Sequence, residues 1–95
     1  MNKTLILYVL SDSIGETGEL IARAAAKQFT TESYEIRKYP FISDEKEIRE
    51  IFDEAVTGGS IFLYTTVLLD IKNLIDELGK AKNIPTIDVM SPPMK

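Results

Sequence analysis

Apolar and polar positions fall into blocks along the chain, and their period switches between that of a strand and that of a helix. Residues 4–10 are almost wholly apolar, which is typical of a strand buried on both faces of a parallel sheet. In the alanine-rich residues 16–29, Ile21, Ala25 and Phe29 recur every four positions and predict one packed face of a helix. Small Ala22, Ala24 and Ala26 are expected to let this helix pack closely. The first third of the chain therefore predicts a strand, a short turn and a helix.

The next segment has a different pattern. In residues 33–39, Tyr34 and Ile36 alternate with Glu35 and Arg37. Alternation of this kind indicates a strand with only one buried face. We therefore expect this strand at an edge of the sheet.

Two further helices and two further strands follow. Ser43 or Asp44 predicts the start of the second helix, and Gly58 with Gly59 predicts its end. Each helix carries one apolar stripe, and we interpret its charged residues as a solvated face. The stripes consist of Ile48, Ile51, Phe52, Ala55 and Val56 in the second helix, and of Ile71, Leu74, Ile75 and Leu78 in the third. The strands are expected at residues 61–64 and 84–90.

This alternation predicts an α/β fold in three layers: a four-stranded parallel sheet of order 2-1-3-4 with helices on both faces, Rossmann- or flavodoxin-like. Residues 1–91 are expected to form a single domain, in whose core Tyr8 and Tyr64 lie. The prolines within residues 92–95 are expected to begin a linker.

Composition excludes several classes of function. The chain has 11 basic and 15 acidic residues, a net charge of −4, which argues against binding nucleic acid or anionic membranes. It has no cysteine and no histidine, so disulfides, thiolate metal sites and serine–histidine catalysis are excluded. No apolar run approaches the roughly 20 residues of a membrane span, and no signal peptide is recognisable, so the cytoplasm is the expected location.

The turn at residues 11–17, Ser-Asp-Ser-Ile-Gly-Glu-Thr, is the strongest candidate for a site. It lies between a strand and a helix, where free backbone N–H groups point toward one place. In such sheets ligands bind where the strand order reverses, here between the first and third strands, and Ser91 could join the rim. The candidate rim consists of Ser11, Asp12, Ser13, Gly15, Glu16, Thr17, Thr65, Thr66 and Asp88.

Two interpretations of this turn stay open. Hydroxyl and N–H groups suit a phosphate, whereas Asp12 and Glu16 would repel one unless a cation such as Mg²⁺ lies between them. Alternatively, Ser13 caps the helix and Glu16 completes a capping box, with Gly15 and Gly18 only allowing close packing. The second interpretation requires no ligand.

Three segments resemble a known family. Residues 9–17 and the alanine-rich residues 19–25 resemble the opening of the bacterial pyruvate, phosphate dikinase / phosphoenolpyruvate synthase regulatory proteins, S-D-S-T-G-E-T followed by a helix. Residues 64–67 are similar to the family's Y-T-L-V, and residues 88–92 to its D-x-x-x-P. The resemblance covers essentially the whole chain.

The resemblance implies a bifunctional serine/threonine kinase and pyrophosphorylase. Such proteins use ADP to phosphorylate, and so inactivate, a threonine of the dikinase or synthase. They also remove that phosphate with inorganic phosphate, releasing pyrophosphate. The implied partner is the dikinase or the synthase, the implied ligands are ADP or ATP and phosphate, and a homodimer is left open.

Two departures narrow this inference. Ile14 stands where the family has threonine, and the chain lacks the nucleotide-binding string G-x-x-x-x-G-K-[ST], which the family carries in a second domain. The resemblance thus implies an N-terminal domain that is inactive alone, with no cofactor of its own and no assigned catalytic residue. The alternatives are a flavodoxin-like mononucleotide-binding module, and a non-catalytic interaction domain in which the turn only caps a helix.

Overall fold

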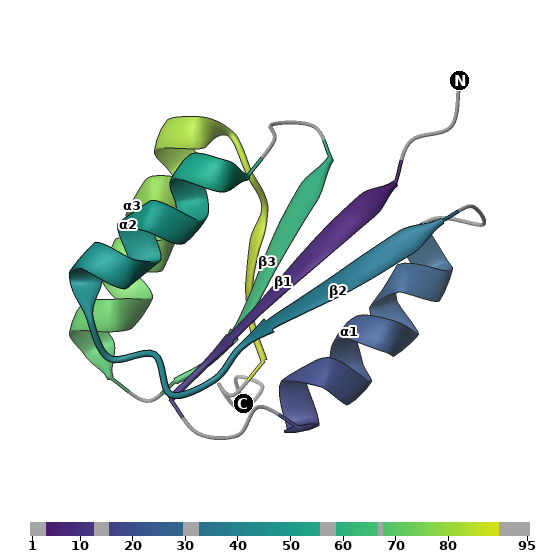
Figure 1. Ribbon diagram of the computed structural model, residues 1–95, viewed down its shortest axis with the longest axis horizontal. Coiled ribbons are helices and arrows are strands. Elements are labelled where there is room, and N and C mark those ends of the chain that lie inside the picture. Colours follow the sequence, from purple (N-terminus) through teal and green to yellow (C-terminus); the bar gives the residue numbers. More distant parts are fainter. Residues whose placement is uncertain (1–3, 13–15, 30–32, 56–58, 67, 90–95) are drawn as a thin grey trace, which may run out of the picture.

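The computed structural model describes residues 4–12, 16–29, 33–55, 59–66 and 68–89, without the side chains of Thr17 and Phe29. Strands and helices alternate along the chain (Figure 1). The elements are β1 (Leu5–Ser11), α1 (Glu16–Phe29), β2 (Tyr34–Tyr39), α2 (Glu45–Glu54), β3 (Ser60–Thr65), α3 (Leu69–Lys82) and β4 (Thr86–Asp88). The predicted strand at residues 4–10 and helix at residues 16–29 therefore lie within one residue of their observed bounds.

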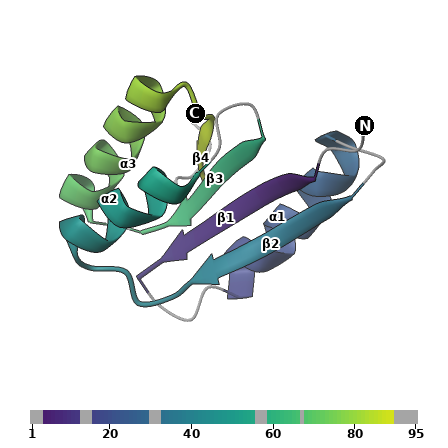
Figure 2. The same cartoon turned by 45° about the horizontal axis from the view of Figure 1, so that its top comes forward.

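The strands form one parallel sheet of order β2-β1-β3-β4, which confirms the predicted topology. The central strand β1 pairs on both sides, so that Leu7 lies between Ile36 of β2 and Ile61 of β3. Helix α1 covers one face of the sheet, and α2 and α3 lie side by side on the other (Figures 1 and 2). The predicted three-layer α/β arrangement is confirmed.

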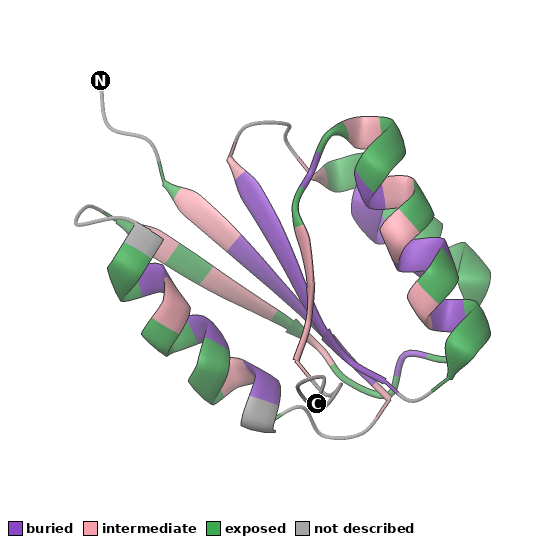
Figure 3. Cartoon of the chain, turned by 180° about the vertical axis from the view of Figure 1, so that it is seen from behind, coloured by how far each residue is buried: buried purple, intermediate pink, exposed green. Residues whose placement is uncertain are grey.

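The exposure of β2 agrees with its place at the edge. Figure 3 shows β3 buried along its length, whereas each residue of β2 is either exposed or half-buried. A central strand is covered on both faces and paired on both edges, whereas β2 pairs only with β1. Among the described residues, no helix is both long and apolar enough to cross a membrane.

Large side chains fill the space between the sheet and α2 and α3. Phe62 of β3 is stacked between Phe52 of α2 and Tyr8 of β1, with ring centroids 3.9 Å and 4.5 Å away. All three side chains are fully buried. Tyr64 belongs to the same cluster, so both predicted core tyrosines are confirmed.

Small residues form the contact between α1 and the other face. Ala22 and Ala26 are fully buried against Val9 and other strand residues. Gly18 comes even closer, because a Cβ atom placed there would lie 2.7 Å from Cγ1 of Val9 and 3.2 Å from Cγ2 of Thr65. The helix therefore lies close to the sheet at a position where only glycine fits without a shift.

The packed face of α1 differs from the predicted one. Ile21 is 37% exposed, so the expectation that it packs with Ala25 and Phe29 is wrong for this residue. Ala25 is half-buried, and the side chain of Phe29 lies outside the described residues. Ala22 and Ala26 are four residues apart, as are Ile21 and Ala25. The close approach of α1 to the sheet requires the pair with the smaller side chains.

Helix α2 begins as predicted but ends early. The Asp44 carboxylate caps it by accepting a hydrogen bond from the backbone N–H of Lys46 at 3.0 Å. The helix ends at Glu54, because Ala55 turns to an extended conformation and its N–H donates to the Phe52 carbonyl at 3.1 Å. The predicted end at Gly58 and the predicted stripe residue Val56 lie outside the described residues.

Strand β4 is shorter than the predicted strand at residues 84–90. Asn83 ends α3 in a left-handed conformation, and the N–H of Ile84 donates to the Gly79 carbonyl at 2.7 Å. Pro85 has no N–H to donate. Regular pairing therefore starts at Thr86, and Met90 lies outside the described residues.

Candidate functional site

The candidate site lies where β1 and β3 end side by side. Ser11, the last residue of β1, pairs with Thr65, the last residue of β3. The chain then continues to α1 on one face of the sheet and to α3 on the other (Figure 1). This divergence is the position at which open parallel sheets bind ligands.

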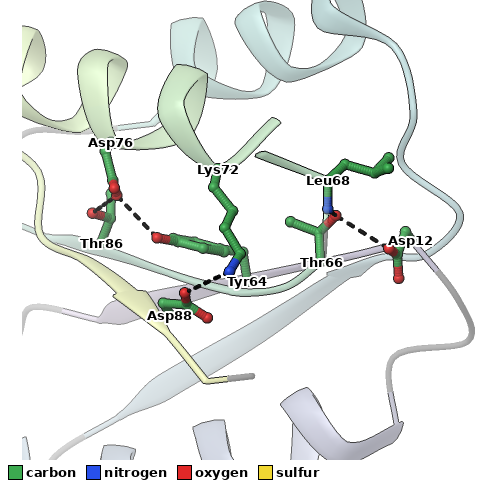
Figure 4. A network of polar contacts seen from close by, with 8 residues as sticks. All are labelled: Asp12, Tyr64, Thr66, Leu68, Lys72, Asp76, Thr86 and Asp88. Carbon is green, nitrogen blue, oxygen red and sulfur yellow. Dashed lines mark hydrogen bonds and ion pairs between the residues drawn. The ribbon is translucent and has the colours of Figure 1, made fainter. Parts of the chain in front are cut away.

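A hydrogen bond joins the two chain segments beyond these strands. The Thr66 hydroxyl donates to Oδ2 of Asp12 at 3.1 Å, across 54 positions of sequence. The backbone N–H of Leu68 in turn donates to the Thr66 hydroxyl oxygen at 3.1 Å (Figure 4). Thr66 is buried and Asp12 is half-buried, so a fixed hydroxyl orients a carboxylate that solvent can reach.

The other two hydroxyl residues at the strand ends are buried as well. Ser11 is 1% exposed and Thr65 is 6% exposed. The methyl group of Thr65 faces α1, where it lies within 3.2 Å of the place a Cβ of Gly18 would take. Both side chains thus lie beneath the edge, and their participation in a binding rim stays a prediction.

The remainder of the predicted turn is described in part. Glu16 is the exposed first residue of α1, which places its carboxylate at the positive end of the helix dipole. Ser13 and Gly15 lie outside the described residues, as does the side chain of Thr17. The capping box and the cradle of backbone N–H groups therefore stay predictions.

Asp88 lies on the α3 side of the sheet and forms an ion pair there. It is opposite Tyr64 in the register of β3 and β4. Its Oδ2 is 3.2 Å from Nζ of Lys72, and both side chains are half-buried (Figure 4). The structure thus unites Asp12 with Thr66, and gives Asp88 a separate partner on α3.

Sequence reasoning missed the neighbouring Asp76. Its Oδ1 accepts hydrogen bonds from the Tyr64 hydroxyl at 3.1 Å and from the Thr86 hydroxyl at 2.9 Å. The interpretation of α3 charges as a solvated face is therefore wrong for Asp76 and Lys72. The available signal was their position, because each directly follows an isoleucine of the apolar stripe and they are four residues apart.

This contact also changes the acidity of Tyr64. Burial of the side chain, followed by the negative charge of Asp76, raises the pKa of the Tyr64 hydroxyl well above its usual value. The hydroxyl therefore keeps its proton beyond the pH at which an ordinary tyrosine ionises, and it acts as a donor to Asp76. The Tyr64, Asp76 and Thr86 contacts tie α3 to β3 and β4, which is a structural role.

The described residues contain no group of three or more acidic side chains able to hold a metal ion. A magnesium site built from Asp12 and a hydroxyl group remains a prediction, because residues 13–15 of the same turn lie outside the described residues. The geometry gives one oriented, accessible carboxylate at the edge of the sheet. Such a group can accept hydrogen bonds from a ligand or attract a cation.

Sequence comparison finds relatives over almost the whole chain. A sequence model of the Kinase/pyrophosphorylase family matches residues 7–95. A putative pyruvate, phosphate dikinase regulatory protein of Alkaliphilus metalliredigens (strain QYMF) is 46% identical over 91 residues, 96% of this chain and 33% of that protein. A protein of the same name from Alkaliphilus oremlandii (strain OhILAs) is 43% identical over 88 residues, 93% of this chain and 32% of that protein.

A third relative of that name, from Carboxydothermus hydrogenoformans, is 40% identical over 87 residues, 92% of this chain and 31% of that protein. The chain thus spans about a third of the length of the curated relatives it matches. Because the family match extends over nearly all of the sheet and its helices, the chain belongs to the Kinase/pyrophosphorylase family.

Proposed function

We propose that this chain is the N-terminal domain of a bifunctional serine/threonine kinase and phosphate-dependent pyrophosphorylase. The observation that carries the proposal is the family match over residues 7–95. The relatives are named as regulators of pyruvate, phosphate dikinase, so the dikinase is the proposed target and the synthase the second candidate. The proposed location is the cytoplasm.

The two proposed reactions balance without a further reactant. In the forward direction, the oxygen of a target threonine forms a bond to the terminal phosphorus of ADP, AMP leaves, and the hydroxyl proton is released. In the second reaction, which removes the phosphate, inorganic phosphate attacks the phosphothreonine phosphorus. The threonine oxygen leaves and takes up a proton, and pyrophosphate forms.

The domain's proposed contribution is a rim that contacts the substrate or the target protein. Asp12 is suited to this role because Thr66 fixes one of its oxygens at the reversal point of the strand order. The nucleotide and phosphate are assigned mainly to the remaining two thirds of the longer proteins. This assignment is supported by the absence of the string G-x-x-x-x-G-K-[ST] from the chain.

A chimera tests this proposal. Residues 1–95 are joined to the part of the Alkaliphilus metalliredigens relative that lies beyond the matched region. Mass spectrometry then measures ADP-dependent phosphorylation of a dikinase threonine, and phosphate-dependent removal with release of pyrophosphate. We expect both activities from the chimera, and neither activity nor tight ADP binding from residues 1–95 alone.

Replacing Asp12 distinguishes a turn that contacts the substrate or the target protein from a turn that has only a structural role. Asp12→Asn keeps the size of the side chain but removes its charge, and we expect a loss of about 10- to 100-fold in kcat/KM, the usual effect of weakening a hydrogen bond to a charged group. The matched control is Asp53→Asn, on the exposed surface of α2, which should leave the rate unchanged. Equal rates for both variants would favour the non-catalytic interaction domain.

A further inference from the structure

A groove lies between α2 and α3, outside the Asp12–Thr66 contact. Its volume is about 610 Å³, and it is lined by the loop before α2, by α2 as far as Arg49 and by α3 as far as Glu77. Its α2 side includes Ser43 and Arg49, and its α3 side includes Leu68, Leu69 and Glu77.

Two adjacent leucines on the α3 side are exposed. Leu68 is 45% exposed and Leu69 is 67% exposed, although both belong to the start of the helix. The hydrogen bond from the Leu68 N–H to Thr66 fixes the backbone at this point. Neighbouring large apolar side chains held at the surface mark contact sites more often than single ones do.

The charge of the groove is negative. On α2, Arg49 is already bound to the Glu45 carboxylate, with its Nε and Nη2 atoms 3.0 Å and 2.8 Å away. On α3, Asp70 and Glu77 lie seven residues apart and so share a face. The positive end of α3 offsets the charge of Asp70 in the first turn, but the dipole effect fades before it reaches Glu77.

We propose that this groove docks a segment of the longer polypeptide found in this family, with apolar side chains against Leu68 and Leu69 and a lysine or arginine facing Glu77. Two observations point to this occupant. The chain matches only about a third of its relatives' length, so a large part of each relative is available to cover the groove. The negative lining selects a basic segment by charge complementarity.

A second copy of this chain is the less suitable occupant. The chain carries a net charge of −4, and a symmetric dimer through this groove would place two copies of the same negatively charged lining against each other. Like charges across an interface oppose association. The proposal uses the family membership and does not depend on phosphotransfer.

Thiol labelling measures coverage of the groove directly, because the chain has no cysteine of its own. Leu69→Cys reports on the groove, and Leu20→Cys on α1 is the matched control, since the two leucines are 67% and 70% exposed. Labelling of each residue is followed by peptide mass spectrometry in residues 1–95 alone and in the chimera described above. We expect labelling at position 69 to slow by about tenfold or more in the chimera, equivalent to about 1.4 kcal/mol of protection, with no change at position 20.

A charge reversal tests the basic character of the segment. Glu77→Lys should restore fast labelling of Leu69→Cys in the chimera, because it places like charges together. Glu50→Lys, at an exposed position of α2 outside the groove lining, should not. If Leu69→Cys remains fully protected from labelling in the chimera that carries Glu77→Lys, the electrostatic part of the proposal is overturned.

Three results would overturn the proposal as a whole. The first is equal labelling of position 69 in the fragment and the chimera. The second is protection of position 69 that rises with the concentration of residues 1–95 alone, which would assign the groove to a second copy. The third is unchanged hydrogen exchange in the peptide matching residues 68–77 when the intact Alkaliphilus metalliredigens relative is compared with the third of it that matches this chain, a measurement that needs no chimera.

Discussion

The two faces of the sheet are packed by different means. On the α2 and α3 side, aromatic rings such as Phe52 and Phe62 stack face to face and occupy the space between layers. On the α1 side, Ala22 and Ala26 let the helix lie close to the strands. The first face is therefore sensitive to removed volume, and the second is sensitive to added volume.

Phe62→Ala is the most severe test of this difference. It removes the middle ring of the Tyr8–Phe62–Phe52 stack, and we expect the free energy of unfolding to fall by about 3–5 kcal/mol. Urea unfolding followed by circular dichroism measures the effect. Phe41→Ala is the matched control: that ring is 66% exposed, and its loss should change stability by no more than about 0.5 kcal/mol.

If the Phe62→Ala variant does not fold, the milder Phe62→Leu still tests whether the stacked rings stabilise this face of the sheet. It should cost roughly 1 kcal/mol, because most of the volume is kept while the stacking is lost. Equal stability of the Phe62 and Phe41 alanine variants would show that the stacked rings are not the main source of stability on this face.

Gly18→Ala tests the opposite face with the addition of one methyl group. Alanine favours the helix by about 1 kcal/mol, whereas overpacking costs about 1–3 kcal/mol. Because the new Cβ would lie 2.7 Å from Val9, we expect a net loss of about 1 kcal/mol. Gly59→Ala is the control, since no heavy atom lies within 4 Å of its Cβ position.

A double-mutant cycle identifies the cause of the Gly18 effect. Combined with Val9→Ala, the Gly18→Ala substitution should cost less than it does alone, because the clashing methyl group is gone. Strict additivity of the two changes would contradict the close approach of α1 to β1.

The contact of Tyr64 with Asp76 has an effect that is expected only at alkaline pH. The raised pKa of Tyr64 means that the folded protein keeps this proton above about pH 10, where an unfolded tyrosine loses it. The contribution of protonated Tyr64 to the free energy of unfolding is therefore complete below about pH 10. It is lost as the pH rises further, by at most about 1.4 kcal/mol per pH unit. Tyr64→Phe should make the alkaline loss of stability shallower.

The comparison for this prediction is Tyr34→Phe, which changes a half-buried tyrosine of β2 in the same way. Urea unfolding between about pH 9 and 11 gives the slope for each variant. The same slope in both variants would mean that Tyr64 does not carry the alkaline sensitivity.

The elements and their order were predictable because they rest on local pattern. The apolar run of β1, the alternation of β2 and the Asp44 cap each indicated the correct element. The ends were less predictable. The end of α2 at Glu54 depends on a backbone hydrogen bond at Ala55 that the residue types do not specify, whereas the late start of β4 follows from Pro85, which has no N–H to donate, together with the hydrogen bond at Ile84.

The candidate site was predictable to the level of strand ends. Placing Asp12 near Thr66 followed from the strand order, because parallel strands carry their last residues to the same edge. The ion pair of Lys72 with Asp88 and the contacts of Asp76 were not foreseen. A charged residue beside an apolar stripe can face either solvent or the sheet, and helical periodicity alone does not distinguish the two.

The sequence by itself determined the alternation of strands and helices, the edge position of β2 and the resemblance of its segments to a family. Only the tertiary structure decided which side of α1 meets the sheet, with Ala22 and not Ile21 buried. It also decided that Thr66 holds Asp12 while Lys72 pairs with Asp88. The physical reason is that periodicity and capping act between near neighbours, whereas close packing and side-chain pairing depend on the distances between elements after they fold together.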